Sequence, residues 1–167
     1  MTIGTAAFVF AACDDTGQAQ SLLDELLKIS PKNMILASIV APLVRAQIER
    51  SRGNLDQAIQ LLESIRTYDG GIVTGIQSNY MRGQLYLHQR RGTEAAAEFK
   101  TILDRRGMDH FSPGHALAHL GLARAAALNG DTAGARKSYQ DFFAMWKDAD
   151  SDLPVLAQAK KEYEQLK

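Results

Sequence analysis

Residues 120–143, LGLARAAALNGDTAGARKSYQDFF, decide the fold, because they predict two helices joined at the short break Asn129-Gly130-Asp131. Small residues fall where the two helices would cross, and large aromatic residues follow on the second helix. The small residues are Ala123, Ala126 and Ala135, and the large ones are Tyr139, Phe142 and Phe143. Such a hairpin cannot bury its apolar side alone, so the stretch predicts further copies of itself nearby.

Four copies of this hairpin are present with the same internal spacing. A small or variable position is followed by a second position three residues later, an alanine nine later, a large residue four later and an apolar residue three later. The alanines, separated by 39, 37 and 40 residues, are Ala19, Ala58, Ala95 and Ala135. A small residue on each helix lets two backbones approach closely, while the large residues fill the groove to the next hairpin.

These copies resemble tetratricopeptide repeats over nearly the whole chain. The resemblance rests on Gly83-x2-Tyr86-x8-Ala95-x3-Phe99, on Gly130-Asp131-x3-Ala135-x3-Tyr139 and on the terminal proline Pro31. The copies depart from the family in being longer than its usual repeat, in having Glu49 and Ala126 where an aromatic residue is expected, and in placing Pro42 inside a helix.

The resemblance implies an all-α fold, a right-handed α-solenoid of four helix hairpins plus a C-terminal capping helix, in one domain over 1–167. The expected repeats are about 1–32, 33–70, 72–108 and 113–148, with the capping helix at 152–166. The helical periodicity of the apolar residues predicts nine helices. These are about 3–13, 17–29, 33–52, 55–66, 72–91, 93–105, 113–129, 132–147 and 152–166.

Composition limits the function classes. Nineteen basic and nineteen acidic residues cancel, and no Lys/Arg-rich stripe occurs. This disfavours nucleic acid or an anionic membrane as the partner. The single cysteine, Cys13, excludes an internal disulfide framework and is expected to pack in the core among alanines. We expect a cytoplasmic protein, or a periplasmic one if the chain is part of a membrane-anchored receptor.

Histidines are the strongest candidates for metal ligands. His115 and His119 are four residues apart and would share one helix face, with His110 and Asp109 close in sequence. However, no cysteine is near and no HExxH motif occurs, so we expect a surface pair and no metal. No nucleophile–base or paired-carboxylate arrangement is present. The sequence therefore predicts no cofactor and no enzymatic activity in this chain.

The expected function is protein–protein interaction, with a peptide or protein segment bound along the concave face that the first helices of the hairpins would line. Seven residues should point into this groove: Gln47, Arg50, Tyr80, Met81, Gln84, His88 and Arg124. They mix hydrogen-bonding, aromatic and cationic groups, which suits a peptide groove. Some members of the family clamp a peptide's terminal carboxylate with Lys and Asn, but Gly4 and Phe8 stand at those places in the first repeat.

A second function is left open. Residues 115–167 resemble the C-terminal end of repeat regions in large bacterial regulators that carry a serine/threonine kinase or winged-helix domain upstream. The chain would then be the sensor or dimerisation region of a larger protein, and a homodimer is compatible with either function. The gene sequence upstream of Met1 would separate the two.

Overall fold

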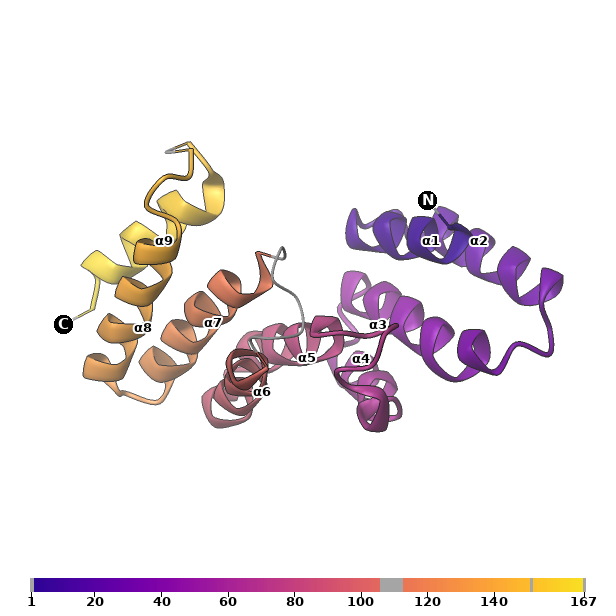
Figure 1. The fold of residues 1–167 in the computed structure, drawn as a ribbon, viewed down its shortest axis with the longest axis horizontal. Helices are drawn as coiled ribbons and strands as arrows, with labels where there is room; N and C mark the ends of the chain where they lie inside the picture. The colour runs from indigo at the N-terminus through magenta and orange to yellow at the C-terminus, as the bar shows by residue number, and fades with distance from the viewer. Residues whose placement is uncertain (1, 106–112, 151, 167) are drawn as a thin grey trace. The chain divides into compact units, whose positions relative to one another are not determined.

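All elements in the described part of the chain are helices. The structure is a computed structural model that describes residues 2–105, 113–150 and 152–166. Figure 1 shows successive hairpins such as α7 and α8, whose helices run side by side in opposite directions. In chain order the elements are α1 (Ile3–Ala12), α2 (Thr16–Ile29), the π-helix η1 (Leu36–Val40), α3 (Ala41–Ser51), α4 (Leu55–Glu63), the 3₁₀-helix η2 (Arg66–Tyr68), α5 (Gln77–His88), α6 (Gly92–Asp104), α7 (Gly114–Leu128), α8 (Thr132–Met145) and α9 (Pro154–Glu164). The predicted all-α fold of four hairpins and a closing helix is confirmed.

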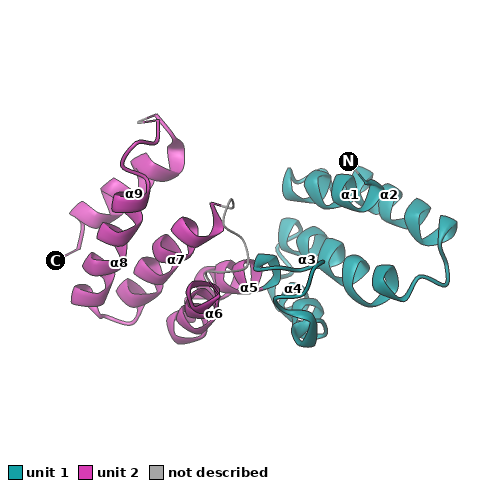
Figure 2. Cartoon of the chain, viewed as in Figure 1, with its two compact units in different colours: residues 1–78 teal, residues 79–167 magenta. Residues whose placement is uncertain are grey.

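The chain divides into two compact units, which Figure 2 colours separately. Unit 1 covers residues 1–78 and holds the first two hairpins, and unit 2 covers residues 79–167 and holds the last two with α9. Each unit has its own apolar core and is described by itself. The prediction of one domain over 1–167 stays a prediction.

The recurring alanines line the seams of the hairpins, as the sequence pattern predicts. Ala19, Ala58, Ala95 and Ala135 have no exposed surface. The large residues four positions later are buried as well, at Leu23, Leu62, Phe99 and Tyr139. Close backbone approach at each seam removes water from these side chains, and each buried Leu- or Phe-sized side chain contributes about 1.5–3 kcal/mol to stability.

Phe99 of α6 is enclosed by two glycines on neighbouring helices. A Cβ atom at Gly83 of α5 would lie 2.6 Å from the Phe99 ring, and one at Gly121 of α7 would lie 2.4 Å from it. The ring is fully buried and meets Tyr80 edge-on, with their centroids 6.1 Å apart. The pair Gly83 and Phe99 was part of the sequence pattern, whereas Gly121 was not.

The turns of the last three hairpins each contain one residue in the left-handed conformation. Gly53 and Gly130 have φ values of 81° and 77°, as expected of glycines that end a helix. In the third hairpin Arg90 takes this position with φ of 58°, although Gly92 is only two residues away. Gly92 begins α6, where a Cβ would lie 2.3 Å from Asn129 Oδ1. This glycine is therefore needed for close packing and not for the turn.

Asp131 and Asn54, which precede α8 and α4, differ in whether their side chains cap these helices. Asp131 accepts a hydrogen bond from the Gly134 backbone N–H at 2.9 Å, as expected of a residue that begins a helix. Asn54 makes no such bond, and its Nδ2 donates to Glu49 Oε2 at 2.7 Å. Glu49 also accepts from Arg52 at 2.9 Å, so this carboxylate ties the turn together at the position where an aromatic residue was expected.

The predicted long helix over 33–52 contains the π-helical segment η1 ahead of Pro42. Proline has no backbone N–H, so it cannot bond to the carbonyl four residues earlier, and a change of helical register accommodates this loss. The Ala41 backbone N–H accordingly bonds to the Leu36 carbonyl, five residues back. The helix expected over 72–91 begins only at Gln77, after a run of turns.

A buried ion pair joins α5 and α6 in unit 2. Arg82 Nε lies 3.1 Å from Glu98 Oε1, and the two side chains are 0% and 5% exposed. Asn79, also buried, donates from Nδ2 to Glu98 Oε2 at 2.8 Å. Burial of two charges is costly unless they are paired and hydrogen-bonded, so this cluster fixes α5 against α6 in one arrangement.

The closing helix α9 has the predicted half-apolar character. Leu156 and Ala159 are buried against Leu120, Ala123 and Phe142 of the preceding hairpin. Pro154 opens the helix, where its missing N–H costs nothing. None of the helices in the described part of the chain is long and apolar enough to cross a membrane.

Candidate functional site

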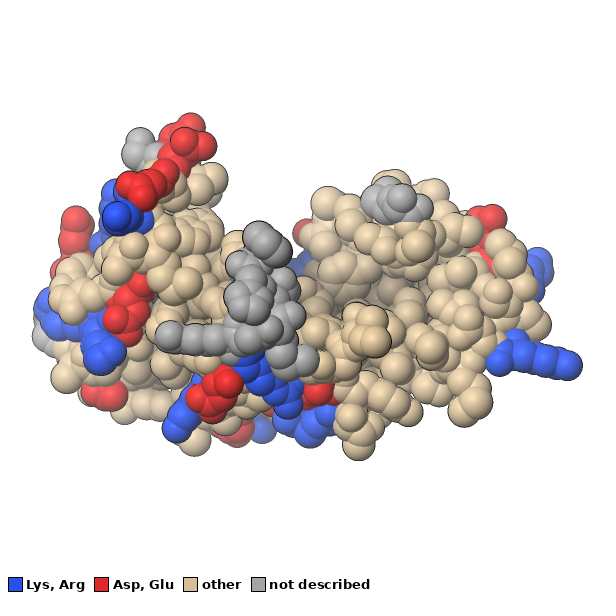
Figure 3. All heavy atoms as spheres, in the orientation of Figure 1, with Lys and Arg blue, Asp and Glu red and all other residues tan. Residues whose placement is uncertain are grey.

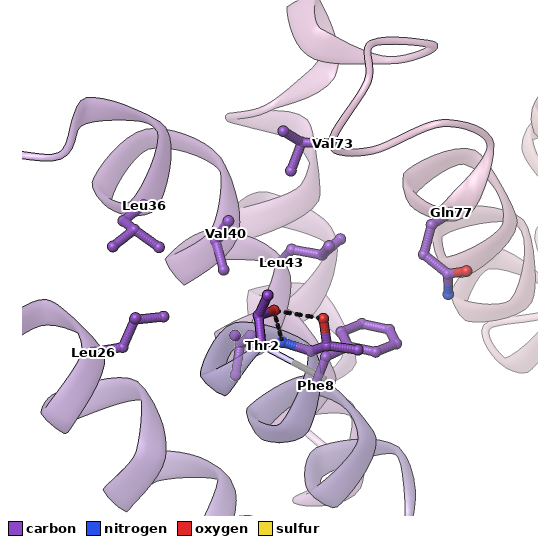
Figure 4. Close-up of a pocket in the computed structure, with 11 residues that line it drawn as sticks. Thr2, Phe8, Leu26, Leu36, Val40, Leu43, Val73 and Gln77 are labelled. Carbon is purple, nitrogen blue, oxygen red and sulfur yellow. Dashed lines mark hydrogen bonds between the residues drawn. The ribbon is translucent and has the colours of Figure 1, made fainter.

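The first-helix face of unit 1 contains an apolar pocket of about 490 Å³. Figure 4 shows that side chains from α1, α2, η1, α3, the loop before α5 and the start of α5 line it. None of the eleven residues that line it carries a charge. These residues are Thr2, Gly4, Thr5, Phe8, Leu26, Leu36, Val40, Leu43, Val44, Val73 and Gln77. Pockets that bind ligands have this character: apolar walls with a few hydrogen-bonding groups.

Local features of the sequence create the pocket. Gly4 leaves room on α1, since a Cβ there would lie 3.4 Å from both Leu26 Cδ2 and Val40 Cγ1. The π-helical segment η1 supplies Leu36 and Val40. Single π-helical turns inside helices are frequent at functional sites. At the mouth, Thr2 Oγ1 accepts from the Thr5 N–H at 3.3 Å, which caps α1 and leaves hydroxyl groups beside the opening.

Exposed apolar residues flank this pocket. Val73 is 43% exposed and also lines a second hollow of about 370 Å³ with Ile39 and Tyr68. Met34 and Ile35, which precede η1, are 78% and 55% exposed. Charged side chains are sparse on the face of unit 1 that Figure 3 presents. Exposed apolar surface around an uncharged pocket is typical of a site that another molecule covers.

Arg50 and Gln47, predicted to point into the groove, lie together in unit 1. The Arg50 guanidinium donates to Asp14 Oδ1 at 2.9 Å and to Ser51 Oγ at 3.2 Å. Gln47 accepts from Arg50 Nε at 3.0 Å when its amide oxygen faces the guanidinium. Hydrogen bonds from Ser51 and the charge of Arg50 hold the pKa of Asp14 below its ordinary value. The positive charge of Arg50 is thus matched by an acid of its own unit.

In unit 2 the structure brings three predicted groove residues together. Burial raises the pKa of Tyr80, while the Arg124 charge and a hydrogen bond with Gln84 act in the opposite direction. Tyr80 and Gln84 come from α5 and Arg124 from α7, so the first helices of neighbouring hairpins meet here as expected. His88, at the end of α5, is exposed.

Two predicted groove residues present little surface. Gln47 is 8% exposed and Met81 is 5% exposed. Each lies four residues from a buried leucine of its own helix, Leu43 and Leu85 respectively, and residues four apart share a helix face. Their positions along the helix therefore place them with the packed side and not with the open side.

Arg124 forms the most elaborate polar cluster of this face. Its Nε and Nη2 atoms donate to Glu162 Oε2 and Oε1 of α9 at 2.9 and 3.1 Å. The Tyr139 hydroxyl donates to Glu162 Oε2 at 2.8 Å, and Gln158 Nε2 donates to Oε1 at 3.0 Å. Burial acts to raise the pKa of Glu162, but the hydrogen bonds from Arg124, Gln158 and Tyr139 outweigh it and lower the pKa.

The pKa of Tyr139 is changed by the same carboxylate. Burial and the hydrogen bond to Glu162 raise the pKa of the Tyr139 hydroxyl, so it stays a proton donor to Glu162. A hollow of about 580 Å³ lies beside this cluster and is lined from α5, α7, α8, α9 and the residues that follow α5 and α9. Arg90 and Leu87 contribute to its wall.

The comparison with protein families supports the hairpin interpretation. Residues 80–149 match the tetratricopeptide repeat family. The match covers most of α5 and all of α6, α7 and α8, that is, the last two hairpins. Tetratricopeptide repeats generally mediate protein–protein interaction. Searches of curated proteins and of solved structures gave no significant match. The resemblance of residues 115–167 to bacterial regulators stays a prediction.

His119 and Cys13 differ in burial from what the sequence predicts. His110 and Asp109 lie outside the described residues. His119 is buried, which corrects the expected surface position, and its Nδ1 lies 3.8 Å from Asp141 Oδ2 because α7 packs on α8. Within the described ranges, no group of three His, Cys, Asp or Glu could hold a metal. Cys13 is exposed at the end of α1, so the expectation that it packs in the core was wrong.

The residues Leu36, Val40 and Val73 of the pocket were missed by sequence reasoning. Gly4 and Phe8 had been noted at the positions where related repeats clamp a carboxylate, and both line the pocket. A small residue and an aromatic one at positions that usually carry polar groups were therefore the signal for an apolar site.

Proposed function

We propose that the chain is a non-enzymatic interaction module that binds a peptide or protein segment along its first-helix faces. In unit 1 the bound segment would place an uncharged apolar side chain in the pocket of Figure 4. The observation that carries the proposal is this pocket of about 490 Å³ without a charged lining residue, beside exposed Ile35 and Val73. An aliphatic or aromatic anchor would remove both surfaces from water.

The test is a selection of random peptides displayed on phage against the full chain. We expect enriched peptides to share an aromatic or aliphatic residue at one position. The variant Val73→Asp places a charge at the pocket mouth, and burying that charge against an apolar anchor is unfavourable. The affinity of an enriched peptide, measured by fluorescence polarisation, should fall by about tenfold or more, which is about 1.4 kcal/mol.

Val9→Asp is the matched control, because Val9 is 45% exposed, close to the 43% of Val73, and does not line the pocket. It should change the affinity by no more than about twofold, as expected of an exposed substitution outside the pocket lining. Circular dichroism should show that both variants keep their helices. Selection without enrichment, or an equal loss of affinity in both variants, would contradict the proposal.

A further inference from the structure

Donors from three helices, α7, α8 and α9, hold the Glu162 carboxylate. Four hydrogen bonds from Arg124, Tyr139 and Gln158 converge on its two oxygens, at 2.8–3.1 Å. The two bonds from Arg124 form a parallel fork, which is the arrangement that recognises a carboxylate with geometric specificity. The cluster is thus a complete carboxylate site that is occupied by a side chain of the same molecule.

This site is accessible and its occupant is replaceable. The Arg124 and Glu162 side chains are 28% and 24% exposed, and a hollow of about 580 Å³ adjoins them. A carboxylate of a partner would restore the same hydrogen bonds to Arg124 and Tyr139 that Glu162 makes, so the exchange of one carboxylate for another has a small net cost. Leu156 and Ala159 before Glu162 and Tyr163 after it pack against the preceding hairpin, so the Glu162 side chain can rotate away while α9 stays packed.

The charged side chains around the hollow favour an acidic ligand. The charged residues that line the hollow are Arg90, Arg124 and Glu162. When Glu162 rotates out, two cationic side chains face the hollow. Tyr80 of α5, which is hydrogen-bonded to Gln84, also senses the Arg124 charge.

We propose that Glu162 is an internal occupant of a carboxylate site on the first-helix face of unit 2, and that a carboxylate of the bound partner takes its place at Arg124 and Tyr139. The proposal rests on the proposed function, since it assumes that a segment lies along this face. It adds that the segment carries a carboxylate, from an acidic side chain or from a free C-terminus, and that α9 competes with it.

The test follows the Arg124 Nε–Hε signal by ¹H–¹⁵N NMR in the full chain during titration with small probes. N-acetylglutamate amide offers a side-chain carboxylate, N-acetylalanine offers a terminal carboxylate, and N-acetylglutamine amide is the neutral analogue. A tethered group competes at an effective concentration in the millimolar range. Glu162→Gln should therefore strengthen binding of a carboxylate probe by about tenfold, with little response to the neutral analogue.

Glu164→Gln is the matched control, because Glu164 is exposed on the same helix and the substitution removes the same charge. It should bind the probes as the wild type does. If Glu162→Gln unfolds the chain, Glu162→Asp replaces it, since the shorter side chain weakens the internal contact; we expect about threefold tighter binding. Tighter binding of either carboxylate probe supports the site, and the stronger of the two identifies the source of the carboxylate.

Equal binding in Glu162→Gln, Glu164→Gln and wild type would overturn the proposal, and so would an equal response to N-acetylglutamine amide. Arg124 and Glu162 would then only fix α9 in place. This test uses neither the pocket of unit 1 nor a selected peptide. Its failure is therefore distinguishable from failure of the proposed function, which the Val73→Asp variant reports.

Discussion

Glu98→Ala is expected to lower the free energy of unfolding by about 3–5 kcal/mol, because it removes the carboxylate that pairs with a buried arginine. Arg82 has no exposed side-chain surface. Glu98 forms an ion pair with Arg82 and accepts a hydrogen bond from Asn79. The substitution leaves the buried charge of Arg82 less well compensated. Urea denaturation followed by circular dichroism would measure the change.

Glu94→Ala is the control on the same helix. Glu94 also pairs with an arginine, with its Oε1 2.9 Å from Arg91 Nε, but both side chains are more than 40% exposed. Its removal should leave the unfolding curve almost unchanged. The double variant Arg82→Met with Glu98→Leu should recover part of the loss, since an apolar pair replaces the ion pair while Asn79 loses its acceptor. A loss below about 1 kcal/mol in Glu98→Ala would show that this cluster is not buried as described.

Gly121→Ala is expected to destabilise the chain by about 2 kcal/mol. The new Cβ would lie 2.4 Å from Cζ of the Phe99 ring, and the backbone of Gly83 is so close to the same end of the ring that a Cβ there would lie 2.6 Å from Cζ. Alanine has a higher helix propensity than glycine by about 1 kcal/mol, so overpacking must exceed that gain. Thermal denaturation of the variant would show the net effect.

Gly17→Ala is the control for this prediction. Gly17 lies in α2, and a Cβ there would meet only Asp15 Oδ1 at 3.9 Å. Its stability should be unchanged or slightly raised. Phe99→Leu in the Gly121→Ala background should cost less than the same change in the wild type, because the smaller side chain makes room for the methyl group. Additive effects would refute the close contact.

The hairpins could be predicted because the pattern depends on side-chain volume at fixed spacing. Ala58 and Ala95 had to be small for two helices to approach, and no compensation elsewhere can change that requirement. The same logic placed the helix boundaries within a few residues at most elements. Gly121 was missed because it touches a helix of the preceding hairpin, and the pattern described contacts within each hairpin.

Arg82 and Glu98 could not be predicted as core residues. A charged residue in an amphipathic helix is normally on the water side, and their pairing requires α5 and α6 to be placed first. The left-handed conformation of Arg90 could not be predicted either, because glycine is the residue that usually adopts it and Gly92 is only two residues away.

The candidate site was predicted in part. Tyr80, Gln84 and Arg124 follow from the helical register, and the structure gathers them. The partners that neutralise the two arginines, Asp14 and Glu162, come from other elements of the same units, so a single helix pattern carries no information about them. Unit 1 therefore contains an uncharged apolar pocket, and unit 2 contains a carboxylate, Glu162, that is held by Arg124 and Tyr139.

A partner that lies against the first-helix face can be captured by site-specific photo-cross-linking in cells, with p-benzoylphenylalanine replacing Val73 at the pocket mouth or Gln60 on the exposed side of α4. We expect position 73 to cross-link to one segment of one protein and position 60 to give no product. Val40→Asp in the pocket should abolish the product from position 73. Cross-links of equal yield to the same protein from both positions would contradict this placement of the partner.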